Sequence, residues 1–539
     1  MKAFSKSDYI LFFLVLAALV WIFFALPPLS LYSHDEGAKY VQMKNFYLNG
    51  SLAIQYPGEN INLPFRHFLP QSLDFAQSGD KLYCIFPPLF AYLSSLFYPF
   101  LGDRVTHFLP MLTFFLSLLL LSRILKWIIR ETFLYYLLLA TFLIGSPLFL
   151  YAFTFWEHLP SVFIVVGSLY FLVRHFYVKE SRRDIFLSAF VLGLGIFFRT
   201  EIFYLMVAFL ISFGTLVGAQ RKAKNLAPLL IGAALPVLGY VLFNLRNYEN
   251  ILGLYIWHNY KELKIYHFSI IDSIVSLGVT VLCLGLVLGA RRGNLDAGDR
   301  REMYSFAAIL GLGFLLAFFG KSPGVKLFSE FPAAFLVFFG ISSRIEKFKD
   351  ESMVFGNLVF GIIVLFIFLV QYFLHGNPHK SVRFCLPIIP FIIIFLASEH
   401  KRIFVNRWMH GITALLILFS FSFGLYNLKN DIWKHKSYNS KRIEFLKKYT
   451  HDGDVIVFAK DGLMEYAGPL FFERIYCITP LPETLTMLFN VLKERGVGYC
   501  YFWASGPGCS SGSFSDQNFR VISSERFGNS TYLFKVLIE

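Results

Sequence analysis

The sequence predicts a polytopic α-helical membrane protein that ends in a small α/β domain. Three observations carry this prediction. Of the 539 residues, 56% are hydrophobic and only 16% are charged, whereas about 25% of residues are charged in ordinary soluble proteins. Apolar runs of about 18 or more residues recur along the chain, and runs of this length are typical of transmembrane helices. From about Asp431 onward, short β-rich runs alternate with helical ones, in the order "GDVIVFAKDG", "RIYCITP", "TLTMLFNVLKERG", "YCYFWAS" and "STYLFKVLIE".

The first apolar run, 9–29, is expected to be a retained helix rather than a cleaved signal peptide. It is long and uniformly apolar, and it has no small-x-small cleavage site. Lys2 and Lys6 precede it and predict a cytoplasmic N-terminus. Further spanning helices are expected at 104–125, 132–154, 159–176, 185–198, 202–220, 226–245, 271–290, 303–320, 326–342, 353–374, 384–398 and 409–427.

The positions of the basic residues support this count of about thirteen helices. With alternating orientation, the basic tracts at 123–130, 174–183, 221–224 and 291–301 all fall on the cytoplasmic side, as the positive-inside rule requires. The net charge of +14 is therefore assigned to membrane orientation and not to nucleic-acid binding. An odd number of spans leaves the C-terminal segment outside the cytoplasm, in a multi-pass protein of the inner (plasma) membrane.

Two regions are expected to depart from simple spanning. Residues 30–103 form a long first outer loop, in which the apolar stretch 83–102 is expected to lie as a helix in the membrane interface because Pro87 and Pro88 would kink a spanning helix. Residues 185–220 form one apolar stretch interrupted by "FRTE" at 198–201. This pattern predicts a tight helical hairpin with Arg199 and Glu201 at its outer tip.

The predicted domains are a membrane domain over 1–430 and an extracytoplasmic α/β domain over 431–539. The second contains no Gly-rich phosphate loop and no metal-ligand spacing, which favours recognition or shielding over chemistry. Its three cysteines, Cys477, Cys500 and Cys509, allow at most one disulfide, and Cys500 with Cys509 is the nearest pair.

Ionisable residues at the predicted outer face come from five loops. Charges at this depth are costly unless they are paired or hydrated, so they tend to line functional cavities. The set comprises His34, Asp35, Glu36, Glu157, His158, Arg199, Glu201, Arg246, His258, Lys261, Lys380 and Arg383.

The adjacent acids Asp35 and Glu36 admit two interpretations. As the first residues of a helix they would be stabilised by the helix dipole, and Lys39, one turn beyond Asp35, would be a surface partner. As a catalytic pair, they would place a general base where it can take a proton from an incoming hydroxyl. The residues alone leave both interpretations open.

The order of several short stretches along the chain indicates a known class of protein. The D-E pair follows the first helix, P-P-L closes the first outer loop at 87–89, and "LGDRVTHFLP" comes next at 101–110. "SPLFLYAFTFWEHLP" (146–160), "GLGIFFRTE" (193–201) and "HKSVRFCLPIIP" (379–390) complete the series. Together they resemble the GT-C glycosyltransferases over about residues 8–430. More narrowly, they resemble the bacterial branch related to protein O-mannosyltransferases and lipid A aminoarabinose transferases.

The resemblance implies transfer of a sugar, with inversion, from a polyprenyl-phosphate carrier to a lipid, glycan or protein acceptor outside the cytoplasm. It implies that Asp35 is the base and that Glu36 supports it, or helps to hold a divalent metal where a member of the class uses one. Arg199 and Arg383 are expected to stabilise the departing phosphate, and Lys39, Lys81 and Arg246 are the second choices for this role. Glu157 and His158 are expected to position sugar hydroxyls or to contribute metal ligands, and Glu201, His258 and Lys380 complete the expected substrate-binding set.

Two departures separate the chain from the aminoarabinose-type members. Phe86 stands immediately before P-P-L, where those members carry a lysine, and the aromatic after D-E, Tyr40, comes one position late. The identity of the substrate therefore does not transfer. An O-antigen ligase or polymerase and a secondary transporter are the alternative functions, but ligases rely on a large late outer loop. Transporters favour midplane charges and paired broken helices, and no internal repeat is visible here.

Overall fold

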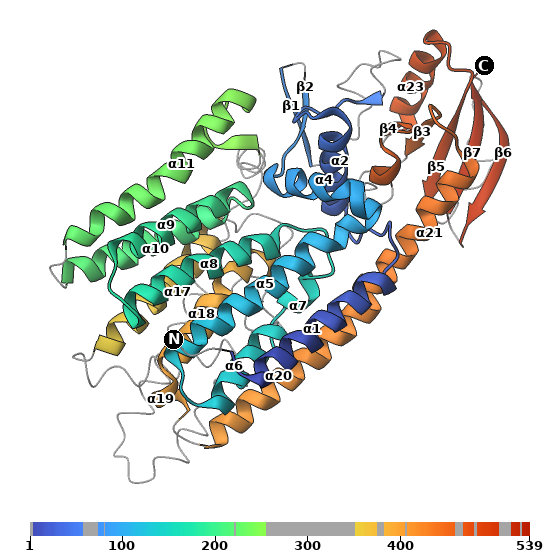
Figure 1. The fold of residues 1–539 in the computed structure, drawn as a ribbon. Helices are drawn as coiled ribbons and strands as arrows, with labels where there is room; N and C mark the ends of the chain where they lie inside the picture. Colours follow the sequence, from blue (N-terminus) through green and yellow to red (C-terminus); the bar gives the residue numbers. More distant parts are fainter. Residues whose placement is uncertain are drawn as a thin grey trace. The chain divides into compact units, whose positions relative to one another are not determined.

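The computed structural model describes residues 4–57, 74–79, 81–219, 223–254, 351–373, 382–404, 407–458, 467–478, 482–505, 519–528 and 531–538 (Figure 1). The chain divides into two compact units that are interleaved in sequence. We call residues 1–19, 110–153 and 157–428 the helical unit, and residues 20–109, 154–156 and 429–539 the sheet unit.

The helical unit consists of packed apolar helices. α9 packs between α8 and α11, and α10 packs against α17, which in turn contacts α18 (Figure 1). The helices of this unit include α6 (Thr132–Leu143), α7 (Leu148–Tyr151), α8 (His158–Tyr177), α9 (Arg182–Leu194), α10 (Ile202–Ala219), α11 (Leu226–Tyr248), α17 (Glu351–Phe373), α18 (Ile389–Ser398), α19 (His400–Ile403) and α20 (Arg407–Asn427). α1 (Lys6–Ala25) and α5 (Val105–Ile128) begin in one unit and end in the other.

Small residues and buried ion pairs fix neighbouring helices of this unit. α9 and α11 approach so closely at Gly232 that a Cβ there would lie 2.5 Å from the carbonyl oxygen of Phe186, the packing that small residues permit between membrane helices. Arg174 donates to both carboxylate oxygens of Asp184 and so ties α8 to α9. Asp8 of α1 is fully buried and accepts hydrogen bonds from Lys126 and Tyr135. These polar contacts satisfy charges that would be costly in an apolar interior.

Within the part of the chain that the structure describes, five helical segments are long and apolar enough to cross a membrane, which marks the chain as an integral membrane protein. They are Lys6–Ala25, Leu89–Ile128, His158–Tyr177, Leu226–Tyr248 and Met409–Tyr449. The expected spans 271–290, 303–320 and 326–342 lie outside the described residues, so the total of about thirteen stays a prediction. The expected span 132–154 is wrong as a single helix. α6 ends at Leu143, and the short α7 begins at Leu148 with Pro147 as its N-cap, because the Gly145–Pro147 segment interrupts the helix.

The C-terminal part of the sheet unit contains a five-stranded mixed sheet with strand order β4-β3-β5-β7-β6. β3 pairs in parallel with β4 and β5, whereas β7 pairs antiparallel with β5 and β6. β6 escaped the sequence prediction because most of its described side chains are exposed or half-buried, so it lacks a hydrophobic pattern. The strands are β3 (Val455–Phe458), β4 (Ile475–Ile478), β5 (Tyr499–Ser505), β6 (Phe519–Phe527) and β7 (Thr531–Ile538).

Two helices cover opposite faces of this sheet. Leu488, Phe489 and Leu492 of α23 (Pro482–Glu494) pack on the face that carries Cys500 and Phe502. Phe445 of α21 (Lys434–Tyr449) contacts Trp503, whose side chain points to the other face because side chains alternate along a strand. Cys500 is a free, fully buried thiol, and Cys509, the nearest cysteine with which it could pair, lies outside the described residues.

The first outer loop contributes the rest of the sheet unit. α2 (His34–Asn49) packs against α4 (Leu89–Leu101), and the β1–β2 hairpin (Phe75–Ser78 and Lys81–Cys84) lies between them in sequence. The expected interfacial helix over 83–102 is wrong in its first part, because residues up to Cys84 form a strand. Pro88 caps α4 and does not kink it, since proline is tolerated where a helix begins.

Candidate active site

The carboxylate turn, which we define as residues 30–39 of the sheet unit, carries the predicted catalytic acids. α2 begins at His34, and Ser33 precedes it in an extended conformation. Asp35 and Glu36 therefore lie in the first helical turn, where the helix dipole stabilises negative charge. Their side chains point about 100° apart around the helix. Asp35 is half-buried and Glu36 is fully buried, so the two acids have different surroundings.

Glu36 is bound within the protein. Its Oε2 accepts a hydrogen bond of 2.8 Å from the backbone N–H of Tyr32 and lies 3.6 Å from Nζ of Lys436 on α21. Both side chains of this ion pair are fully buried. Burial raises the pKa of Glu36, and the nearby ammonium of Lys436 opposes that rise. Glu36 is thus a structural anchor of the turn, whereas Asp35 is the more accessible of the two acids.

His34 and Lys39 complete the carboxylate turn. Nε2 of His34 lies 2.9 Å from Oδ2 of Asp74, which directly precedes β1. Lys39 is only 2% exposed, and its ammonium lies 4.1 Å from the centre of the Phe86 ring, a cation–π contact. Lys39 is therefore buried and not at the surface, where the first interpretation expected it. The phenylalanine before P-P-L contacts a lysine supplied by α2.

The arginine cluster, which we define as Glu157, His158, Arg199 and Glu201, lies in the helical unit. Arg199 donates from Nη1 to Glu157 at 2.7 Å and from Nη2 to Glu201 at 2.6 Å. Nε2 of His158 lies 3.3 Å from Nη1. The four side chains are at most 5% exposed. The sequence placed Arg199 and Glu201 at the tip of a hairpin, and the structure buries them between α9 and α10.

Arg383 is joined to this cluster by one aromatic ring. The guanidinium groups of Arg199 and Arg383 lie 5.8 Å and 5.2 Å from the centre of the Phe384 ring. Arg383 is half-buried, whereas Arg199 is 5% exposed and shared by two carboxylates. Of the two arginines expected to contact a phosphate, Arg383 is therefore the more accessible one, and Arg199 balances buried negative charge.

The remaining predicted residues are less informative. Arg246 is exposed on the last turn of α11, and Lys81 is exposed at the start of β2. His258 and Lys380 lie outside the described residues. Among the residues that the structure does describe, no three His, Cys, Asp or Glu side chains come together as a metal-ligating group, so no role is assigned here to a metal.

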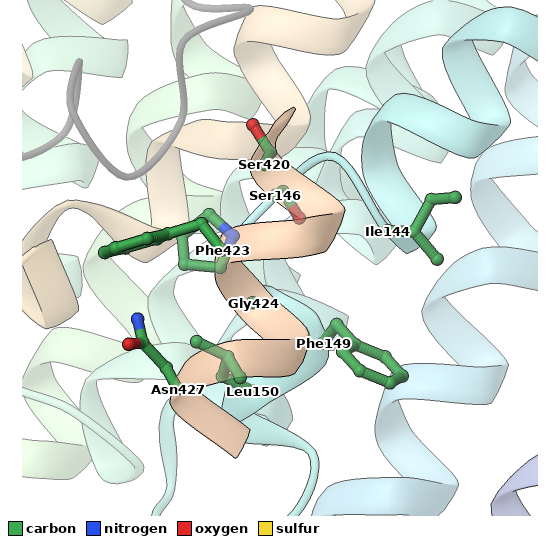
Figure 2. Close-up of a pocket in the computed structure, with 9 residues that line it drawn as sticks. Ile144, Ser146, Phe149, Leu150, Ser420, Phe423, Gly424 and Asn427 are labelled. Carbon is green, nitrogen blue, oxygen red and sulfur yellow. The ribbon is translucent and has the colours of Figure 1, made fainter. Parts of the chain in front are cut away.

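A pocket in the helical unit lies beside the α6–α7 connection and α20 (Figure 2). Its lining includes Ser146, Phe149, Ser420, Phe423 and Asn427. These are aromatic and neutral polar groups, and the lining holds no ionisable side chain. The pocket therefore offers no acid, base or cation for catalysis, and the predicted site residues lie elsewhere.

Four residues near the carboxylates were missed by sequence reasoning: Asp74, Asp431, Lys436 and Asn439. Lys436 and Asn439 did carry a signal, because Lys436, Asn439, Ile443 and Leu446 form one buried stripe of α21 at helical spacing. Two polar residues on such a stripe indicate a buried polar contact. Asp74 carries no comparable signal in the sequence.

No protein-family model matches the sequence, and no curated protein matches it. Among solved structures, the chain is similar to ArnT from Cupriavidus metallidurans bound to undecaprenyl phosphate. The sequences are 12% identical, the TM-score is 0.47, and 98% of each chain is covered. It is also similar to the archaeal oligosaccharyltransferase AglB from Archaeoglobus fulgidus in complex with an inhibitory peptide and a dolichol-phosphate. There the identity is 12%, the TM-score 0.46, and the coverage 92% of this chain and 70% of AglB.

Proposed function

We propose that the protein transfers a sugar from a polyprenyl-phosphate carrier to a lipid, glycan or protein acceptor on the extracytoplasmic side of the inner membrane, with Asp35 as the general base. The observation that carries this proposal is the half-buried carboxylate of Asp35 in the first turn of α2, beside a fully buried Glu36. The ordered stretches that resemble GT-C glycosyltransferases supply the reaction class.

In the proposed reaction Asp35 takes the proton of the acceptor hydroxyl as the acceptor oxygen attacks the anomeric carbon. The bond from that carbon to the phosphate oxygen breaks, and the electron pair leaves with the polyprenyl phosphate. Attack opposite to the leaving group inverts the anomeric centre. Glu36 does not take a proton in this scheme, because it anchors the turn through Tyr32 and Lys436.

The departing phosphate gains negative charge as the bond breaks, and a fixed cation beside it would stabilise the transition state. We assign this role to Arg383, whose planar guanidinium can donate two parallel hydrogen bonds to a phosphate. Arg199, which contacts the same Phe384 ring, supports it by balancing Glu157 and Glu201. Contacts of Glu157 and His158 with sugar hydroxyls, and of Arg246, His258 and Lys380 with the substrate, stay predictions.

Arg383→Ala tests the phosphate contact. It should weaken use of the donor by about 10- to 100-fold, since a hydrogen bond to a charged group contributes about 1.5–3 kcal/mol. The measurement is release of polyprenyl phosphate, followed by mass spectrometry, from a panel of polyprenyl-phosphate-linked sugars added to membranes that contain the protein. Arg383→Lys keeps the positive charge but loses the planar guanidinium with its paired N–H donors. Its use of the donor should lie between those of wild type and Arg383→Ala. Arg183→Ala, an exposed arginine of α9, is the control. Unchanged donor kinetics in Arg383→Ala would remove this residue from the site.

A further inference from the structure

We infer that α21 holds the carboxylate turn in its working position and that Lys436 is a positioning residue for Asp35. This inference rests on the proposed role of Asp35. It also gives the C-terminal segment, expected to serve recognition or shielding, a part in catalysis.

Lys436 makes two contacts with the turn. Its Nζ donates to the carbonyl oxygen of Ser30 at 2.9 Å and lies 3.6 Å from Oε2 of Glu36. Lys436 is fully buried, and a buried lysine is rare unless it is paired. Replacing such a pair by apolar side chains often leaves stability unchanged or raises it. The Lys436–Glu36 pair is therefore not explained by stability alone, and its geometry points to a role in positioning the carboxylate turn.

Other side chains of the same C-terminal segment hold the next two residues. Nδ2 of Asn439 donates to the carbonyl oxygen of Leu31 at 2.9 Å. The hydroxyl of Tyr32 donates to Oδ2 of Asp431 at 2.6 Å, and burial together with the carboxylate of Asp431 raises the pKa of that hydroxyl. Ser30, Leu31 and Tyr32 are therefore each fixed by α21 or by the turn that leads into it.

The connection between β3 and β4 fits closely against the same part of α2. A Cβ at Gly468, in the 3-10 turn Gly468–Leu470, would lie 2.8 Å from the carbonyl oxygen of Gly37. Lys44, further along α2, donates to the carbonyl oxygen of Pro469 at 3.2 Å and pairs with Glu473 at 3.1 Å. The carboxylate turn is thus held on its buried face by side chains that lie about 400 residues later in the chain.

These contacts determine where Asp35 lies. Glu36 connects the ammonium of Lys436 with the backbone N–H of Tyr32, so one buried carboxylate fixes the start of α2 on both sides of Asp35. A displacement of about 1 Å of a catalytic group can slow a reaction by about 100-fold. Loss of Lys436 should act in this way, because it frees the carbonyl group of Ser30 and removes the ammonium group that lies 3.6 Å from Glu36.

The test uses full-length protein and a readout that does not require the substrate. A hydrophobic carbodiimide adds covalently to protonated carboxyl groups, and mass spectrometry of peptides gives the labelling rate of Asp35 across a range of pH. In Lys436→Met, the rate and its pH dependence should differ from wild type by several-fold, and the release of polyprenyl phosphate should fall by up to about 100-fold. Lys441→Met, at an exposed lysine of the same helix, should match wild type in both.

Two further variants complete the test. Glu36→Gln with Lys436→Met removes both buried charges and should bring the Asp35 labelling profile back toward wild type. Asn439→Ala removes one neutral hydrogen bond and should give a smaller change in the same direction, which keeps the test informative if Lys436→Met does not fold. Wild-type labelling profiles in Lys436→Met or, failing that protein, in Asn439→Ala would overturn the inference. A different outcome is that the variants change the labelling of Asp35 as expected but the wild-type protein transfers no sugar. That outcome would contradict the proposed function and leave the positioning role intact.

Discussion

Replacing Asp35 by asparagine is expected to reduce sugar transfer by about 100- to 10,000-fold, the contribution that a general base usually makes. Asparagine has nearly the same shape as aspartate but cannot take the proton of an acceptor hydroxyl. Asp35 is half-buried and belongs to the first turn of α2, and the loss of its charge removes an interaction with the helix dipole of about 0.3–1 kcal/mol. Membrane insertion and folding should therefore be retained.

The measurement is the release of polyprenyl phosphate by membranes that contain equal amounts of each protein. Asp35→Glu keeps a carboxylate but moves it by one methylene, and it should retain part of the activity. Glu444→Gln removes an exposed carboxylate from α21 and should leave the rate unchanged. Turnover close to wild type in Asp35→Asn would end the assignment of Asp35 as the base.

Replacing Arg199 by methionine is expected to have the largest effect on stability. Arg199 bridges Glu157 and Glu201, and all three side chains are at most 6% exposed. Removing one partner of a buried ion pair typically costs about 3–5 kcal/mol, because a charge stays buried without compensation. Here two carboxylates would lose the same partner, so the cost should lie in the upper part of that range.

Thermal unfolding of the purified protein in detergent measures this effect, with Arg183→Met at an exposed arginine as the control. A triple variant that combines Arg199→Met with Glu157→Gln and Glu201→Gln removes the uncompensated charges and should recover most of the loss. If Arg199→Met were as stable as Arg183→Met, the arginine cluster would not contribute to stability, and its proposed support of Arg383 would have no physical basis.

Hydrophobic patterning in the sequence was sufficient to predict the apolar helices. Runs such as 9–29 and 226–245 correspond to α1 and α11, because length and apolar content decide whether a segment can cross a membrane. The strands β3, β4, β5 and β7 were visible for the same reason. β6 was missed because its side chains are largely exposed. The end of α6 at Leu143 was missed because the prediction followed the long apolar run 132–154 and gave no weight to the short Gly-Ser-Pro segment within it.

The candidate site was predicted in its parts but not in its contacts. Glu157, His158, Arg199 and Glu201 were each singled out, yet only the fold shows that Arg199 lies between two carboxylates. The sequence left open whether Asp35 and Glu36 are helix-start acids or a catalytic pair, and the structure shows that Glu36 faces the buried side of α2. The partner that buries Glu36 is Lys436, 400 residues away, and no local pattern at Glu36 indicates a contact at that distance.

The most direct test of the proposed function is a comparison of envelope glycans, by mass spectrometry, between cells that lack the gene and the same cells given back either the wild-type gene or Asp35→Asn. We expect a single sugar addition on one lipid, glycan or protein that is present with the wild-type gene and absent both without the gene and with Asp35→Asn. Identical glycans in all three strains would contradict the proposal that this protein transfers a sugar with Asp35 as its base.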